Sequence, residues 1–243
     1  MFWQRFKRNG IPEYLAKHYW WAYLWRVGVI FFDHQMIINA ILFGQYKKLA
    51  NHALERFDAK SHGKTLQLTC VYGNLSTKLA ERLPVEDFHI ADIATIQLKT
   101  TRQKLRKAWG DNNDPLNLVC MNAENLAYRK NSFSCIIIFF LFHELPPEAR
   151  KHAVTEIVRV LQPGGRLIIV EYSYTNPKHI LHRFPPFRFI LSGLEPYLPE
   201  FLEENFLEKM AAEATRQDKS ISHTNQTEIF NGFYRVIEIN MAK

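Results

Sequence analysis

The chain has 243 residues, of which 47% are hydrophobic, and a formal net charge of +7 with a pI near 9.3. This length supplies one sizeable core, or one domain with a terminal extension. No run of about 18 apolar residues occurs, so no transmembrane helix is predicted. A basic surface suits nucleic acid or an anionic membrane. The abundance of Trp, Tyr and Phe favours the membrane, because neither zinc-finger spacing nor an aromatic RNA-binding signature is present.

Residues 1–58 are predicted to form an N-terminal helical extension. The basic, aromatic start at residues 1–8 is open to three interpretations: a targeting remnant, a membrane-surface arm or a solvated tail. Residues 12–53 then follow a helical pattern. One stretch of it holds more aromatic rings than one helix face can bury, so some are expected to line an apolar pocket or to lie at a bilayer interface: Tyr19, Trp20, Trp21, Tyr23 and Trp25.

Residues 59–243 are predicted to form an α/β domain with a Rossmann-like, doubly wound, seven-stranded sheet. The sheet should be mostly parallel with an antiparallel last strand pair. The expected strands are 65–71, 87–91, 116–121, 135–141, 166–171 and two within 220–240, with Gly232 as a candidate bulge. The expected helices are 77–82, 95–109, 147–161 and 199–214. Cys70, Cys120 and Cys135 fall in these strands and are expected to be core thiols in a reducing compartment.

Residues 178–202 interrupt the strand–helix alternation. Prolines, aromatic residues and arginines are interleaved there, which is typical of a lid or a surface-lying insertion rather than of a core element. This insertion is, with the aromatic N-terminal helix, a candidate for membrane docking.

Residues 66–75 predict a buried strand, a tight turn and the start of a helix, the arrangement at which open parallel sheets bind ligands. Asn74 and Ser76 are expected to cap that helix. Compared with the pattern acidic-x-Gly-x-Gly-x-Gly, Gln67 stands at the acidic position and Thr69 and Val71 replace the first two glycines. Of the motif glycines only Gly73 remains. An ordinary strand–helix turn is therefore an equal alternative.

Two later strand ends carry candidate nucleoside contacts. Asp92 ends the second strand and is expected to accept both hydroxyls of a ribose, with a helix cap before Ile93 as the alternative. Asn122 and Ala123 follow the third strand, where such folds meet an adenine ring. Asn122 could equally be a turn-forming residue.

The fourth strand leads into Phe139-Phe-Leu-Phe-His-Glu-Leu-Pro146, in which His143 and Glu144 are ionisable neighbours in apolar surroundings. They are candidates for binding a metal or moving protons, and Glu171 at the end of the fifth strand is a candidate third ligand. Tyr172 beside it could touch a substrate. A structurally satisfied histidine and surface tyrosines are the alternatives.

The five strands, the turn near Asp92 and Leu161-Gln-Pro-Gly-Gly-Arg-Leu167 resemble a class I S-adenosylmethionine-dependent methyltransferase over residues 63–171. A more specific resemblance covers most of the chain. Pro12-Glu-Tyr-Leu-Ala-Lys-His-Tyr-Trp-Trp-Ala-Tyr23, Val71-Tyr-Gly-Asn-Leu-Ser76 and Phe139-Phe-Leu-Phe-His-Glu144 resemble the rhodoquinone-biosynthesis methyltransferase-like proteins (the RquA family).

This resemblance implies conversion of ubiquinone to rhodoquinone, in which an amino group from S-adenosylmethionine replaces a ring methoxy group with Mn²⁺ as the supporting metal. The expected cofactor contacts are Gln67, Val71, Tyr72, Gly73, Asp92, Ile93, Asn122, Ala123 and Phe139. The expected catalytic residues are Tyr72, His143, Glu144 and Tyr172, and the candidate metal ligands are His143, Glu144 and Glu171.

Gln67 suggests a physical reason for such chemistry. A carboxylate at this position would hold the cofactor's α-ammonium in its charged form, whereas an uncharged amide lets the amine become a nucleophile. Because ubiquinone is a polyprenyl lipid, peripheral membrane contact is expected, at a bacterial cytoplasmic face or in a mitochondrion-related organelle. A conventional quinone methyltransferase and a non-catalytic scaffold of a quinone-synthesis complex remain alternatives, and nucleic acid is not an expected partner.

Overall fold

The structure is a computed structural model that describes residues 2–7, 10–58, 63–110, 117–173, 179–183 and 185–243. Its centre is a seven-stranded sheet of order β3-β2-β1-β4-β5-β7-β6. The strands are β1 Thr65–Leu68, β2 Phe88–Asp92, β3 Leu118–Cys120, β4 Phe133–Phe139, β5 Leu161–Tyr172, β6 Ile221–Ile229 and β7 Tyr234–Met241. The first five are parallel, and β7 pairs antiparallel with both β5 and β6. This arrangement confirms the predicted fold class.

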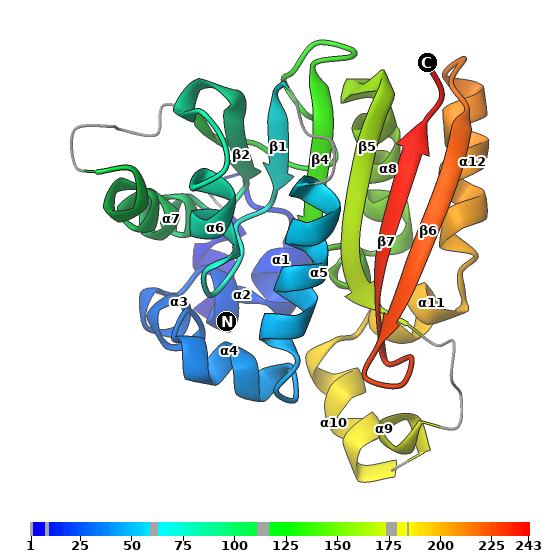
Figure 1. Cartoon of the computed structure of the whole chain (residues 1–243). Coiled ribbons are helices and arrows are strands. Elements are labelled where there is room, and N and C mark those ends of the chain that lie inside the picture. The colour runs from blue at the N-terminus through cyan, green and yellow to red at the C-terminus, as the bar shows by residue number, and fades with distance from the viewer. Residues whose placement is uncertain (1, 8–9, 59–62, 111–116, 174–178, 184) are drawn as a thin grey trace.

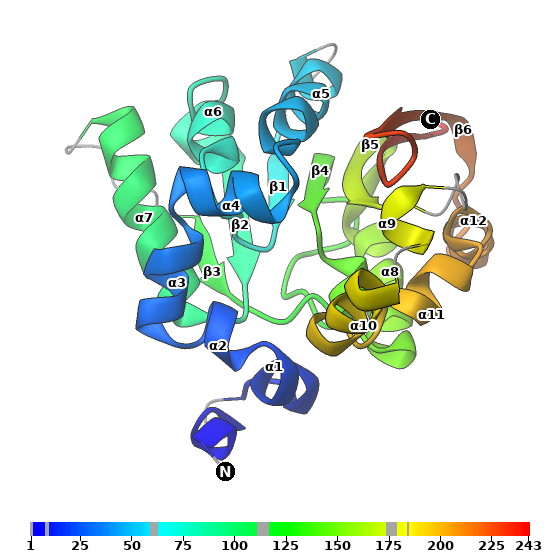
Figure 2. The ribbon, with the colours of Figure 1, turned by 90° about the horizontal axis from the view of Figure 1, so that it is seen from below.

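Helices cover both faces of the sheet (Figures 1 and 2). On one side lie α5 Tyr46–Asp58, α6 Leu75–Ala80 and α7 Thr95–Trp109, and on the other lie α8 Pro147–Val160 and α12 Phe206–Arg216. The apolar side of α5 shares one hydrophobic core with the sheet, through Leu49, Ala53 and Phe57 among others. Arg166 of β5 donates to the carbonyls of Arg56 and Phe57, which closes the last turn of α5.

Short helices gather at the end of the sheet where the parallel strands finish (Figure 1). From the N-terminal region these are η1 Phe2–Arg5, α1 Glu13–His18, α2 Trp20–Tyr23, α3 Arg26–Phe32 and α4 Gln35–Ile41. From the segment between β5 and α12 come α9 Ile180–Arg183, α10 Pro185–Leu194 and α11 Leu198–Glu203. The 3-10 helices η3 Val85–Asp87 and η4 Phe142–Glu144 complete the described helices. Among the described helices, none has the length and hydropathy to cross a bilayer.

Several local predictions need correction. The first strand ends at Leu68 rather than at residue 71, because Thr69 takes a left-handed conformation with φ 72°. Gly232 lies in the β6–β7 hairpin turn, and the sheet irregularity is at Ile221 instead. The helix predicted over 199–214 is two helices, since Asn205 caps α12 by accepting from the Glu208 amide. Cys120 is exposed, because β3 is an edge strand.

Candidate active site

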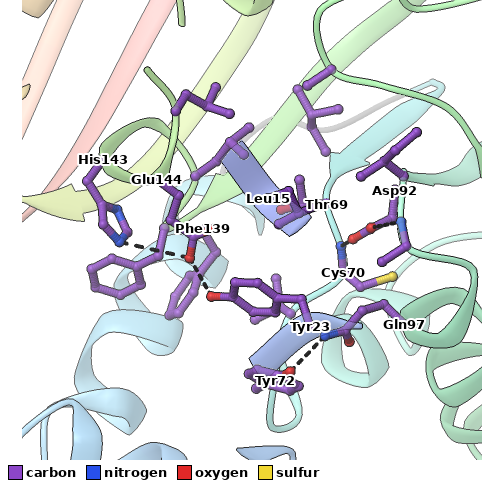
Figure 3. Close-up of a pocket in the computed structure, with 18 of the residues that line it drawn as sticks. Leu15, Tyr23, Thr69, Cys70, Tyr72, Asp92, Gln97, Phe139, His143 and Glu144 are labelled. Carbon is purple, nitrogen blue, oxygen red and sulfur yellow. Dashed lines mark hydrogen bonds and ion pairs between the residues drawn. The ribbon is translucent and has the colours of Figure 1, made fainter. Parts of the chain in front are cut away.

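A pocket lies at the carboxyl ends of β1, β2 and β4, under the short N-terminal helices (Figure 3). The strand ends contribute Thr69, Cys70, Val71, Asp92 and Phe139 to its lining. The N-terminal helices contribute Tyr14, Leu15, Tyr23, Ile38, Ile41 and Leu42. The predicted site residues Tyr72, Ile93, Asn122, Ala123, His143, Glu144 and Tyr172 also line it. Residues from separate predicted motifs therefore meet in one cavity.

The loop after β1 takes left-handed backbone conformations although two of the motif glycines are missing. Thr69 has φ 72° and Gly73 has φ 79°, so two of the three motif positions are left-handed. A Cβ atom on Gly73 would lie 2.5 Å from the Tyr46 hydroxyl, which explains why this glycine is retained. The predicted side-chain caps are absent: Asn74 occupies the N-cap position without a capping bond. Instead the Tyr46 hydroxyl accepts from the Asn74 and Leu75 amides, at 2.7 and 3.0 Å.

Gln67 does not line the pocket. Its side chain is fully buried in β1, and its Nε2 donates to the Thr69 carbonyl at 2.9 Å. This bond supports the left-handed turn at Thr69, which is a strained conformation for a β-branched residue. Among the described residues, Gln67 Oε1 has no hydrogen-bond partner. The placement gives Gln67 a structural task beside the electrostatic one that the sequence suggests.

Tyr72 connects α2 to α7 through the hydrogen bonds of its side-chain hydroxyl. Its hydroxyl donates to the Ala22 carbonyl and accepts from Gln97 Nε2 at 2.7 Å, as Figure 3 shows for Gln97. Its ring stacks on Tyr23, with centroids 5.8 Å apart. The hydroxyl proton is therefore already engaged, and the pocket receives the aromatic ring.

Asp33, the acid that interrupts the apolar stretch of residues 27–43, makes a second connection between the N-terminal helices and the rest of the domain. Asp33 Oδ1 accepts from the Gly73 amide at 3.0 Å and pairs with Lys104 Nζ at 2.6 Å. Lys104 also donates to the carbonyls of Val71 and Gly73. The end of α3 is thus attached to both the β1 loop and α7.

Asp92, the last residue of β2, lines the pocket. One carboxylate oxygen accepts from the Cys70 amide and the other from the Ala94 amide, both at 2.7 Å (Figure 3). Each carboxylate oxygen can accept a second hydrogen bond. Burial raises the pKa of Asp92 to about 6, against the opposing effect of the two amide donors. The group is thus a pocket-facing carboxylate with free acceptor capacity.

Asn122 forms a local turn. Its Oδ1 accepts from the Glu124 amide and its Nδ2 donates to Glu124 Oε1, at 3.0 and 3.1 Å. Because Nδ2 has a second hydrogen and Oδ1 a second lone pair, the turn leaves room for one further bond to a ligand.

His143 is the centre of a buried charged cluster at the other end of the pocket. Its Nδ1 lies 2.7 Å from Glu171 Oε1, and its Nε2 lies 3.7 Å from Glu195 Oε2 and 4.0 Å from Glu144 Oε1. Glu171 also accepts from the backbone amides of Phe142 and Tyr172. Tyr23 donates to Glu144, and Figure 3 shows this hydroxyl pointing at the carboxylate.

The cluster shifts the protonation of its members. Burial alone would lower the pKa of His143, but the charges of Glu171, Glu195 and Glu144 raise it to about 9. Burial raises the pKa of Glu144 to about 8 and also raises that of Glu195. His143 is therefore an imidazolium near neutral pH, and Glu144 titrates close to the range suited to proton transfer.

The metal prediction is not supported. Within the described part of the chain, no group of three His, Cys, Asp or Glu side chains is arranged to hold a metal ion. Glu171 is fully buried and engaged with His143 and two backbone amides, and Glu144 is engaged by Tyr23. In this structure the three predicted ligands are therefore occupied by other partners, Glu171 by His143 and the backbone and Glu144 by Tyr23, rather than arranged around one ion.

Sequence reasoning did not single out Glu195 or Tyr46 as site residues. Glu195 directly follows α10 in the predicted insertion, and its approach to His143 joins residues 52 positions apart. Its one sequence signal is that it ends an acid-free stretch, residues 178–194. Tyr46 is the first residue of α5, and nothing local marks it as the cap of a helix 28 residues later.

The sequence of this chain is similar to those of known methyltransferases. Residues 65–165 match the family model of a methyltransferase domain. The chain is 26% identical over 212 residues to the ubiquinone/menaquinone biosynthesis C-methyltransferase UbiE of Pasteurella multocida, covering 86% of this chain and 76% of that protein.

Solved structures share the fold at low identity. A protein of Methanococcus maripaludis described as a putative S-adenosyl-L-methionine-dependent methyltransferase superposes with a TM-score of 0.56 at 21% identity, covering 90% of this chain and 94% of that one. The cyclase SpnF superposes with a TM-score of 0.53 at 15% identity, covering 79% of each chain. Residues 65–165 therefore resemble a methyltransferase domain, and the chain has a fold that is found among solved methyltransferases and also in a protein named for another reaction.

Proposed function

Because the chain has this fold and its pocket presents the Asp92 carboxylate at one end and the charged His143 cluster at the other, we propose that it is an S-adenosylmethionine-dependent transferase acting on a quinone. The observation that carries the proposal is that Asp92 and the His143 cluster line opposite ends of one apolar pocket. The name of the similar UbiE protein supports a quinone as the acceptor.

The cofactor would lie over the ends of β1 and β2. Asp92 would accept the ribose hydroxyls, and Ile93, Asn122 and Ala123 would flank the adenine ring. Tyr72 would contribute its ring, and Phe139 would form the wall between the cofactor and the acceptor. The quinone ring would then face Tyr172, His143 and Glu144, which line the opposite part of the pocket.

We propose more specifically that the product is rhodoquinone. In that exchange the free amine of S-adenosylmethionine attacks the ring carbon, the bond from this carbon to the methoxy oxygen breaks, and the methoxy group leaves with one amine proton as methanol. The bond between the cofactor's Cα and the nitrogen then breaks as a proton moves from Cβ to the nitrogen, which leaves an amino group on the ring and releases the rest of the cofactor as an α,β-unsaturated acid. His143 Nε2 would donate to a quinone oxygen on which negative charge develops. Glu144 would accept a proton from the incoming amine. Uncharged Gln67 supports this choice, because no carboxylate at its position holds the amine in its charged form.

The deciding experiment uses ubiquinone with S-adenosylmethionine labelled separately at the amino nitrogen and at the methyl carbon, followed by mass analysis of the quinone. Labelled nitrogen on the ring together with free methanol supports rhodoquinone formation. Labelled methyl together with stoichiometric S-adenosylhomocysteine identifies a conventional methyltransferase, the function that the UbiE name favours. The reaction is run after chelation and again with added Mn²⁺, since the described residues offer no ready metal site.

A matched pair of variants tests separately the cofactor-binding role of one end of the pocket and the catalytic role of the other. Asp92→Asn should weaken cofactor binding, whereas Glu144→Gln should abolish turnover and leave cofactor affinity within about twofold of the parent protein. Calorimetric absence of S-adenosylmethionine binding to the parent protein would refute the proposal and favour the scaffold alternative.

A further inference from the structure

Large apolar side chains are exposed at one end of the molecule. We call them the apolar rim: Trp25, Val27, Ile30, Phe31, Met36, Ile41 and Phe43 from α3, α4 and their flanks, with Phe189 and Leu194 of α10. Met36 is 74% exposed and Phe189 is 84% exposed. They are the large apolar side chains found exposed in the described chain, and such a concentration marks an interaction surface.

The apolar rim borders the pocket. Figure 2 looks onto this end of the molecule, with α3 and α4 on one side and α10 on the other. Ile41 is both exposed and part of the pocket lining, so the apolar surface continues from the outside into the site. On the opposite side Glu195, the residue after Leu194, lines the pocket and approaches His143. A ligand entering between α4 and α10 therefore passes the apolar rim.

The charges beside the apolar rim are almost all positive. Residues 24–54 contain one acid, Asp33, which is paired with Lys104, and residues 179–194 contain none. Arg26, Lys47 and Lys48 are exposed on the α3–α5 side and form no ion pair with other described residues. Apolar side chains surrounded by unpaired cations complement an anionic lipid surface.

This charge distribution also argues against a second copy of the chain as the occupant. Two copies that met through the apolar rim would bring like charges together in a protein that already carries +7. They would also close the pocket border at Ile41.

We propose that the apolar rim docks on an anionic lipid bilayer, so that the pocket opens toward the membrane between α4 and α10. The docking site thus differs from the aromatic stretch at α1–α2, whose Tyr19 and Ala22 are buried and whose Tyr23 stacks on Tyr72. That a lipid quinone enters by this route rests on the proposed function, but the docking itself is tested without any substrate.

The test is flotation of the full chain with vesicles of phosphatidylcholine alone and of phosphatidylcholine with phosphatidylglycerol. The parent protein should float with the anionic vesicles, and less in high salt. Met36→Glu with Phe189→Glu should lower the bound fraction about tenfold. The matched control, Ala211→Glu with Thr224→Glu, places the same charges at exposed positions of α12 and β6 and should float like the parent.

Three results would overturn the inference. The first is that the parent protein floats with neither kind of vesicle. The second is that the apolar-rim variant floats to the same extent as the control variant. A parent dimer in the absence of lipid that the apolar-rim variant splits into monomers would instead identify a second copy as the occupant. Turnover of a water-soluble, short-chain ubiquinone should stay unchanged in the apolar-rim variant, so a failure of docking is separable from a failure of the proposed reaction.

Discussion

Cofactor affinity should depend on pH through Asp92. Burial raises the pKa of this carboxyl to about 6, and ribose hydroxyls would donate to the ionised form. Binding therefore favours the deprotonated group and should weaken as the pH falls below 6. With that pKa, roughly a tenth of the protein is ionised at pH 5 and nearly all of it at pH 7. The Kd for S-adenosylmethionine should then rise about tenfold, or about 1.4 kcal/mol, between these pH values.

Isothermal titration calorimetry at pH 5, 6, 7 and 8 measures this dependence, with circular dichroism to verify folding at each pH. Asp92→Asn provides the control. Its amide must point one N–H toward a backbone donor, either Cys70 or Ala94, and it lacks the charge that strengthens each ribose bond. The variant should bind at least 10-fold more weakly at pH 7, since one charge-assisted bond is worth about 1.5–3 kcal/mol, and should show no dependence below pH 6. A parent Kd that stays constant from pH 5 to 8 in folded protein would refute the assigned role of Asp92.

Three further outcomes are expected. Gly73→Ala should lower the free energy of unfolding by about 3 kcal/mol, because its Cβ meets the Tyr46 hydroxyl at a left-handed position, whereas Gly44→Ala, also at positive φ but with no described atom within 4 Å of the new Cβ, should cost about 1 kcal/mol. Equal losses in urea denaturation would contradict the close approach. The pKa of His143 is raised from 6.5 to about 9, so its stabilising contribution is complete below pH 6.5 and is lost as the pH rises to 9. Thermal denaturation of the parent should therefore shift downward over that interval more than that of His143→Gln. Glu195→Gln removes a carboxylate 3.7 Å from His143 Nε2 and should lower the pKa of His143 in an NMR titration, and an unchanged titration would exclude Glu195 from the cluster.

The fold was predictable because hydrophobic periodicity carries most of it. The helix predicted over residues 95–109 is α7 at both ends, and the charge-free stretch of residues 135–141 falls largely within the central strand β4. Predictions failed where a single backbone conformation decides the outcome. Nothing in the composition of the first strand reveals that Thr69 turns left-handed, since this depends on support from Gln67 within the folded sheet.

The sequence predicted which residues after strand ends line the candidate site, but not which side chains from different elements contact each other. Asp92, Ile93, Asn122, Ala123 and His143 follow strands whose carboxyl ends meet at one edge, so they were expected to converge. Which polar groups pair with each other is a matter of side-chain geometry. The ion pair of Glu171 with His143 and the hydrogen bond of Tyr23 to Glu144 engage all three side chains that the sequence predicts as metal ligands.

Gln67 shows why the charge of a site residue and its hydrogen bonds need to be tested separately. Gln67→Glu restores the acidic residue of the usual motif, but an ionised glutamate cannot donate to the Thr69 carbonyl. A change in product could then arise from a distorted loop as well as from the new charge. Gln67→Leu, which removes the donor without adding charge, is the necessary companion in any such experiment.

The attachments of the N-terminal helices have a consequence for how the chain acquires its structure. Asp33 bonds to Gly73 and Lys104, 40 and 71 residues later, and Tyr14 and Tyr23 bond to Glu124 and Glu144, 110 and 121 residues later. During synthesis these first helices leave the ribosome long before their partners exist, and each is too short to persist alone. The N-terminal helices, although made before the central strands, are therefore expected to become ordered after those strands have formed.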